Sequence, residues 1–172
     1  MLQMKNILIM LFLFGISSCS TTTYYVVRHA EKADATSSDP VLSAEGGIRA
    51  VALKDSLLSK GIDSIFVSSM QRTQLTAAPL AVATGIAPVV IQASMPGTQS
   101  LITRLKKITG NQSILIVGHS NTVPIIVDSL MRSPQHIAIP ENDFDNFYQV
   151  KIKHSSSPKR TLQIKTYGAV SP

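Results

Sequence analysis

The chain has 172 residues, which is enough for one domain with a sizeable core but hardly enough for two. Its apolar fraction of 44% and its ordinary glycine and proline contents exclude a disordered or fibrous chain. The net charge is +6, but the basic residues are scattered and no aromatic residues interleave with them, which disfavours nucleic-acid binding. A modestly basic surface suits a phosphorylated substrate or an anionic membrane, and it equally suits a surface that only keeps the protein soluble.

The N-terminal residues predict export from the cytoplasm. Lys5 precedes an apolar run over residues 7–16, which has the length of a signal-peptide core and is shorter than the roughly 20 apolar residues of a transmembrane helix. Ser17 and Ser18 then supply the small residues that a signal peptidase needs. Cys19 follows directly. Because it is the single cysteine of the sequence, an internal disulfide and a multi-cysteine metal site are excluded.

Residues 16–19 resemble a bacterial lipobox, in which the cysteine is lipidated and becomes the first residue of the mature chain. We therefore expect a lipoprotein signal peptide over residues 1–18, a polar tether over 19–23 and a single domain over 24–172. The expected location is the cell envelope, at its periplasmic or outer-membrane face, with Cys19 as the lipid anchor. Two alternatives remain open: an ordinary secretory signal cleaved nearby, and an apolar N-terminal helix kept in the core.

Beyond the tether, short β-forming runs alternate with segments of helical periodicity. In chain order, the predicted elements are a strand over 24–27, a loop over 33–40, a helix capped by Ser43 and ended by Gly61, a strand over 63–68, a helix over 72–84, a strand over 88–92, a helix from near Thr98, a strand over 113–117, a helix over 124–130, and strands over 147–152 and 161–166. Pro79 lies inside the second helix, where it removes an amide donor, so we expect a kink or a restart there.

This alternation predicts an α/β fold, namely a three-layer α/β/α sandwich around a mostly parallel, mixed sheet of about five to six strands. In such sheets, ligands bind beyond the carboxyl ends of the strands. Three predicted strands end there in polar residues: Arg28 and His29, residues 68–69 shortly before Arg72, and His119. We therefore expect these two arginines and two histidines to meet at one edge of the sheet.

Two arginines and two histidines around one ligand favour phosphoryl transfer. Arginine offers a rigid fork of donors that matches phosphate oxygens, and positioned cations stabilise the charge of a phosphoryl group in transfer. A neutral imidazole can attack phosphorus and form a phosphohistidine, which water then cleaves. The arginine charges are expected to lower the pKa of His29 and to help keep it neutral. A helix N-terminus after His119 would add backbone donors.

Four segments together resemble the histidine phosphatase superfamily, which has the phosphoglycerate-mutase-like fold. They are Val-Arg-His-Ala at 27–30, Leu-Ser-Ala-Glu-Gly at 42–46 with Arg49, Ser-Ser-Met-Gln-Arg-Thr at 68–73 with Thr76, and Val-Gly-His-Ser at 117–120. They follow the family's order and spacing over residues 24–130. The resemblance implies a metal-independent phosphatase with no cofactor, in which His29 is the nucleophile and Arg28, Arg72 and His119 complete the phosphate pocket.

Ser120 and Asn121 directly follow His119, so we expect them to add donors for the substrate. The chain departs from the family at two points. Ala30 stands where the family has glycine, a small change if the backbone there avoids positive φ. The acid that protonates the leaving group is missing from both positions that the family uses, because Ser120 replaces an Asp and residues 73–118 contain no Asp or Glu.

By elimination, the candidate proton donors are Glu141, Asp143 and Glu31. We interpret Glu31 rather as an ion-pair partner of Lys32 or Arg28, whereas Glu141 and Asp143 lie in a proline-flanked loop that can fold over the pocket. A substrate with a good leaving group, such as a pyrophosphate or a phosphohistidine, would need no acid.

Three functions are compatible with these residues. The first is a phosphatase that hydrolyses a phosphomonoester or phosphoanhydride through a phosphohistidine on His29. The second is a non-catalytic lipoprotein of the same fold that binds a phosphorylated ligand, which the missing acid motivates. The third is a metal hydrolase with His29, Glu31 and His119 as ligands, although two flanking arginines would repel the cation. The expected partners are a small phosphorylated substrate or phosphate, and a membrane through the lipid on Cys19, but no nucleic acid.

Overall fold

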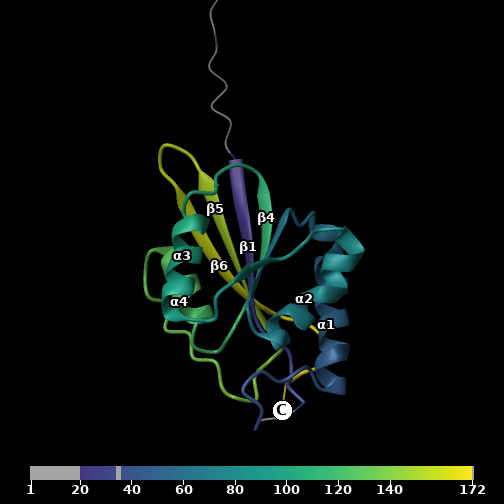
Figure 1. Cartoon of the computed structure of the whole chain (residues 1–172). Coiled ribbons are helices and arrows are strands. Elements are labelled where there is room, and N and C mark those ends of the chain that lie inside the picture. Colours follow the sequence, from purple (N-terminus) through teal and green to yellow (C-terminus); the bar gives the residue numbers. More distant parts are fainter. Residues whose placement is uncertain (1–19, 34–35, 172) are drawn as a thin grey trace, which may run out of the picture.

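The computed structural model describes residues 20–33 and 36–171 (Figure 1). The strands are β1 (Ser20–Arg28), β2 (Ser64–Ser68), β3 (Val89–Ile91), β4 (Gln112–Gly118), β5 (Asn146–His154) and β6 (Lys159–Thr166). The helices are α1 (Ala44–Leu57), α2 (Gln71–Thr84), α3 (Met95–Leu105) and α4 (Val123–Met131), with a 3₁₀ turn η1 (Leu58–Lys60) after α1. The predicted signal peptide, Cys19 and residues 34–35 of the predicted loop lie outside the described residues.

The strands form one sheet in the order β3-β2-β4-β1-β5-β6. β1, β4, β2 and β3 pair in parallel, and β5 and β6 add an antiparallel edge. The mostly parallel, mixed sheet predicted from the sequence is therefore confirmed. Parallel pairing brings the carboxyl ends of β1, β2 and β4 to the same edge, where Arg28 is the register partner of Gly118.

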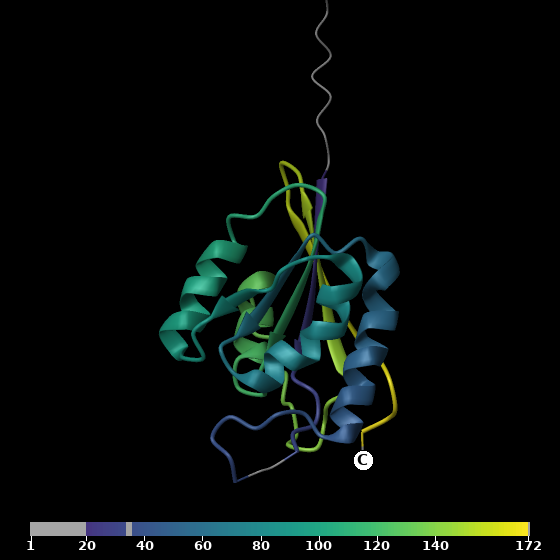
Figure 2. The ribbon, with the colours of Figure 1, turned by 45° about the vertical axis from the view of Figure 1, so that its right-hand side comes forward.

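Helices cover both faces of the sheet, and β1 shows why. α3 and α4 lie on one face of the sheet, and α1 and α2 on the other (Figures 1 and 2). Tyr24 and Val26 pack into one core with side chains of α3 and α4, while Tyr25 and Val27 pack into the other with side chains of α1 and α2. Successive side chains of a strand point to opposite faces, so a slip by one residue would exchange the two sets. Because both faces are buried, the register of β1 is firmly fixed, and so is the position of the residues at its end.

The prediction of a tether over residues 19–23 is wrong for residues 20–23, which form the first part of β1. These residues pair with β5 on one side, and from Thr22 onward with β4 on the other. Thr22 is fully buried, and its Oγ1 donates to the carbonyl of Gly110 at 2.9 Å. Threonine is β-branched and suits a strand when its hydroxyl finds a partner, so this polar segment continues the sheet instead of leaving it.

Two helices differ from their predicted form. α2 runs through Pro79 as one helix without a restart. The carbonyl of Leu75 loses its amide donor there, but Leu75 is 39% exposed, so water can take the place of that donor. α3 begins at Met95 rather than near Thr98, because the Oγ of Ser94 accepts a hydrogen bond from the amide of Gly97 at 3.1 Å and caps the helix.

The start of α1 is docked onto the segment that follows β1. Ser43 caps this helix as predicted, since its Oγ accepts from the amide of Gly46 at 3.1 Å. A Cβ at Gly46 would collide with the backbone carbonyl of Glu31, whereas a Cβ at Gly47 would have no neighbour within 4 Å. The close contact at Gly46 therefore fixes α1 against the chain two residues beyond His29. None of the helices within residues 20–33 and 36–171 has both the length and the apolar character needed to span a bilayer.

Candidate active site

The four predicted pocket residues meet at one edge of the sheet. Arg28 ends β1 and His29 follows it, Arg72 lies in the first turn of α2 after β2, and His119 directly follows β4. All four line one cavity of about 240 Å³, which we call the His29 cavity. The ring centroids of His29 and His119 are 5.4 Å apart. The convergence expected from the strand ends is thus what the structure shows.

His29 is held as a neutral imidazole with a defined tautomer. Its backbone amide donates to the carbonyl of Gly118 at 2.9 Å, which ties it to β4. Its Nδ1 lies 2.7 Å from the carbonyl of Ala30, and a carbonyl only accepts, so Nδ1 carries the hydrogen and the lone pair is on Nε2. Burial, followed by the charges of His119, Arg28 and Arg72, lowers its pKa from 6.5 to about 3.

Ala30 adapts to this site without strain. The positive-φ residues other than glycine in the described part of the chain are Arg132 and His136, so Ala30 has a negative φ that suits any L residue. Its side chain is fully buried, and its amide donates to Oγ1 of Thr76 on α2 at 2.9 Å. The replacement of the family's glycine is therefore accommodated.

Arg28 binds the loop that precedes β5. Its Nη1 donates to the carbonyls of Pro140, Glu141 and Asp143 at 2.7, 3.0 and 3.1 Å, and its Nη2 lies 3.2 Å from Oε2 of Glu141. Its guanidinium also lies over the ring of Phe144, 4.3 Å from the centroid. One buried arginine thus fixes this loop beside the cavity, and one of the two hydrogens of Nη2 remains for an anion.

Arg72 and His119 form the opposite wall. Nη1 of Arg72 lies 4.0 Å from Oδ1 of Asp39, which also accepts from the amide of Gln71 at 2.8 Å and so holds the 36–40 segment at the start of α2. Burial first, and then the charges of Arg72 and Arg28, lower the pKa of His119 from 6.5 to about 4. Both histidines are therefore neutral at neutral pH, and the two arginines supply the positive charge.

Ser68 is a site residue that the sequence reasoning did not assign. Its Oγ lies 2.9 Å from Nε2 of His119 and 2.8 Å from Oγ1 of Thr73, and it accepts from the amide of Met70 at 3.3 Å. This network holds the ring of His119 through its Nε2. The available signal was the position of Ser68 at the end of a strand, just before Arg72.

The three candidate proton donors lie in different surroundings. Glu141 lines the His29 cavity and its side chain is 83% exposed. Both carboxylate oxygens of Asp143 accept from the side-chain amide of Asn146, at 2.8 and 2.7 Å. Glu31 binds Arg49 with both carboxylate oxygens, at 2.8 and 2.9 Å from Nε. Its ion-pair partner is therefore Arg49, and the expectation of Lys32 or Arg28 as the partner is wrong. Among the described residues that line the cavity, Glu141 alone carries a carboxyl group.

Ser120 and Asn121 line the His29 cavity, whereas two backbone amides at the start of the following helix are used elsewhere. The amides of Thr122 and Val123 both donate to the carbonyl of His119, at 3.0 and 2.9 Å. They close the turn into α4 and so fix His119 rather than point at a ligand.

The ligand set of the metal-hydrolase hypothesis is not assembled, because Glu31 is bound to Arg49. Over residues 20–33 and 36–171, no three His, Cys, Asp or Glu side chains gather in a way that could hold a metal ion.

Comparison with known proteins agrees with this geometry. The family model of the histidine phosphatase superfamily (branch 1) matches residues 24–95, which include His29 and Arg72. The comparison with curated proteins gave no match.

Solved structures share the fold over most of their length. A candidate phosphohistidine phosphatase SixA from Nakamurella multipartitia is 21% identical, with a TM-score of 0.63, 87% of this chain covered and 98% of the other. A protein histidine phosphatase SixA in complex with tungstate is 19% identical, with a TM-score of 0.66, and the match covers 84% of this chain and 96% of the other. A mycobacterial glucosyl-3-phosphoglycerate phosphatase in complex with inorganic phosphate is 15% identical, with a TM-score of 0.64, and the match covers 84% of this chain and 96% of the other. This chain thus has the phosphoglycerate-mutase-like fold, and its residues 24–95 are similar to the histidine phosphatase superfamily.

Proposed function

We propose that this chain is a metal-independent phosphatase that passes a phosphoryl group from a phosphomonoester or phosphoanhydride to His29 and then to water. The observation that carries the proposal is the neutral, single-tautomer His29 in one cavity with two arginines. The family-model match over residues 24–95 and the phosphatases among the structural neighbours support phosphatase activity. The tungstate and phosphate complexes of two neighbours support a tetrahedral oxyanion as the ligand of this cavity.

In the first step, the lone pair on Nε2 of His29 attacks phosphorus, and the bond from phosphorus to the leaving atom breaks with its electron pair on that atom. The phosphorylated ring becomes cationic, and the carbonyl of Ala30, which accepts from Nδ1–H, stabilises that charge. The remaining Nη2 hydrogen of Arg28, together with Arg72 and His119, stabilises the negative oxygens in transfer. In the second step, water attacks phosphorus, the P–N bond breaks and its electron pair returns to Nε2.

Glu141 is the proposed proton donor to the leaving atom. It contributes a carboxyl group to the His29 cavity, and its position is set by the contacts of Arg28 with the loop around it. Proton donation is expected to limit the rate only for poor leaving groups. The leaving groups of phosphoanhydrides and phosphohistidines depart without this help.

Hydrolysis of an activated aryl phosphate in the presence of a chelator tests the proposal. Wild-type protein should turn over, and His29→Asn, whose side-chain amide can still donate to the carbonyl of Ala30, should be at least about 1,000-fold slower. A brief reaction quenched at high pH should yield an acid-labile phosphoenzyme in wild type and none in the variant. Tight phosphate binding without turnover across a substrate panel would instead favour a non-catalytic binding protein.

We also propose that the protein is exported and anchored through a lipid on Cys19. β1 begins at Ser20, immediately after the predicted anchor, and ends at Arg28 in the site. Nine strand residues at about 3.3 Å each separate the two ends by roughly 30 Å, so the site would open away from the membrane. A Cys19→Ser variant should become soluble in fractionated cells, and unchanged partitioning into membranes would contradict the anchor.

A further inference from the structure

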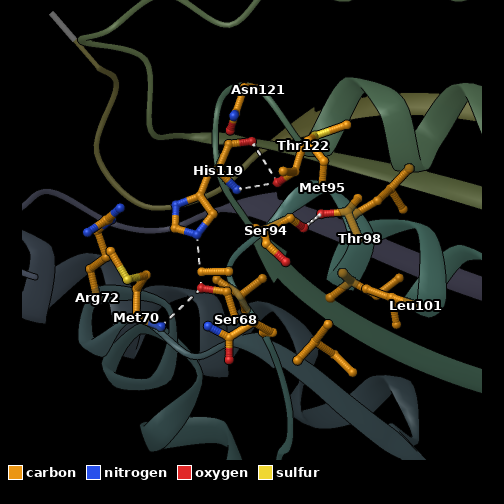
Figure 3. A pocket seen from close by; sticks show the side chains of 17 residues that line it. Ser68, Met70, Arg72, Ser94, Met95, Thr98, Leu101, His119, Asn121 and Thr122 are labelled. Atoms are coloured by element: carbon orange, nitrogen blue, oxygen red, sulfur yellow. Dashed lines mark hydrogen bonds between the residues drawn. The ribbon is translucent and has the colours of Figure 1, made fainter.

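A second cavity of about 210 Å³ adjoins the His29 cavity, and we call it the side pocket (Figure 3). Arg72, His119 and Asn121 line both cavities, so the two share a wall. In Figure 3, Arg72 and His119 lie toward one end of the side pocket, and Thr98 and Leu101 toward the other. The side pocket therefore extends from the predicted phosphate position toward α3.

The lining of the side pocket combines apolar and uncharged polar side chains and carries almost no charge. Its apolar side chains come from β3, β4, α3, α4 and the residue before α2, and include Met70, Ile91, Met95, Leu101, Ile116 and Ile126. Arg72, at the shared wall, is the one charged side chain among the described lining residues. At the far end, Leu101, Ile116 and Ile126 are 5%, 1% and 2% exposed. An ionised group placed there would lose its water and meet no counterion.

The geometry of the transfer determines which part of a substrate would enter this pocket. In phosphoryl transfer, the attacking and leaving atoms lie roughly in line on opposite sides of phosphorus. His29 lines the His29 cavity but not the side pocket. A leaving group that points away from His29 and passes Arg72 and His119 would enter the side pocket.

We propose that the side pocket binds the leaving group, and that this group is uncharged and largely apolar, such as an aryl or short alkyl group. The proposal rests on the proposed phosphatase function and narrows its substrate class. The volume is sufficient, because an apolar cavity of about 150 Å³ accepts a benzene molecule. Leaving groups that carry further phosphate or carboxylate charges fit this lining poorly.

Two aryl phosphates with leaving groups of similar acidity test this directly. The substituent is an ethyl group in 4-ethylphenyl phosphate and an anionic chain in 4-(2-carboxyethyl)phenyl phosphate. Wild-type protein should show a kcat/KM at least about tenfold higher for the ethyl compound, because the carboxylate must be desolvated without a partner. Equal values for the two substrates would overturn the proposal.

A matched pair of variants separates the pocket from general charge. Met95 lies at the pocket and is 54% exposed, while Val90, on the neighbouring strand β3, is 52% exposed and does not line it. Met95→Lys should reduce the preference for the ethyl compound at least about fivefold, and Val90→Lys should leave it unchanged within about twofold. Equal effects of the two lysines would contradict the pocket.

Acetyl phosphate, whose acetyl group is too short to reach the buried end, serves as the reference substrate. If wild-type protein hydrolyses acetyl phosphate but does not discriminate between the aryl phosphates, the side-pocket proposal is wrong and the phosphatase proposal stands. If none of the three compounds is hydrolysed and no phosphoenzyme forms, the phosphatase proposal is wrong and the leaving-group proposal falls with it.

Discussion

The burial of His29 should make the folded protein lose stability as the pH falls below neutrality. The pKa of this histidine is 6.5 as a free side chain and about 3 in the fold, mainly because burial disfavours the cation. Between these values the unfolded chain binds a proton that the folded chain does not, so the free energy of unfolding decreases as the pH decreases. The stability is fully present above pH 6.5 and is lost progressively down to the folded pKa of about 3.

The magnitude follows from the size of the pKa difference. The loss accumulates at about 1.4 kcal/mol per pH unit, so between pH 6.5 and pH 5 His29 alone should lower the free energy of unfolding by about 2 kcal/mol. His119, whose pKa is lowered to about 4, acts in the same direction. The total is a large part of the stability of a domain of this size.

Urea denaturation followed by circular dichroism at pH 7.5, 6.5, 5.5 and 5 measures this dependence. Between pH 7.5 and 5, the free energy of unfolding of His29→Asn should decrease by about 2 kcal/mol less than that of wild type, because asparagine does not titrate. His136→Asn, which removes an exposed histidine, should retain the wild-type dependence. If His29→Asn and wild type lose the same stability between pH 7.5 and 5, the buried neutral imidazole is not the cause and the reasoning is refuted.

Three further predictions concern the site and its support. Ser68→Ala removes the hydroxyl that lies 2.9 Å from Nε2 of His119, and should lower kcat/KM by about 5- to 100-fold with a smaller effect on folding; an unchanged kcat/KM would rule out a positioning role. Glu141→Gln should slow hydrolysis of alkyl phosphates at least about tenfold and leave 4-nitrophenyl phosphate within about twofold, whereas equal losses on both would argue against proton donation. Gly46→Ala should destabilise the fold by more than about 2 kcal/mol in thermal unfolding, because its Cβ would meet the carbonyl of Glu31. Gly47→Ala has open space and a helical backbone, so it should be neutral or stabilise the fold by up to about 1 kcal/mol. The reverse order of these two alanine variants would contradict the packing at the start of α1.

Local features of the sequence were sufficient for the alternation of strands and helices and for the residues at the strand ends. The period of the apolar residues and the continuous run at 113–117 report burial on one or both faces, and burial is what makes a strand or helix form. Because carboxyl ends of parallel strands share one edge, the meeting of Arg28, His29, Arg72 and His119 followed from their positions alone. Errors occurred where a local signal was ambiguous, as for the polar residues 20–23, whose β-strand conformation depends on partners in β4 and β5.

The sequence by itself determined the fold class and the meeting of the four residues of the His29 cavity, since these depend on periodicity and on the order of elements. Only the tertiary structure decided the partners: Glu31 binds Arg49, Arg28 binds the loop of Glu141, and Ser68 holds His119. The side pocket likewise could be found only in the tertiary structure, because its walls come from β3, β4, α2, α3 and α4. Such contacts join residues far apart in the chain, and no local pattern of spacing or hydropathy specifies which distant side chains will lie within hydrogen-bonding distance.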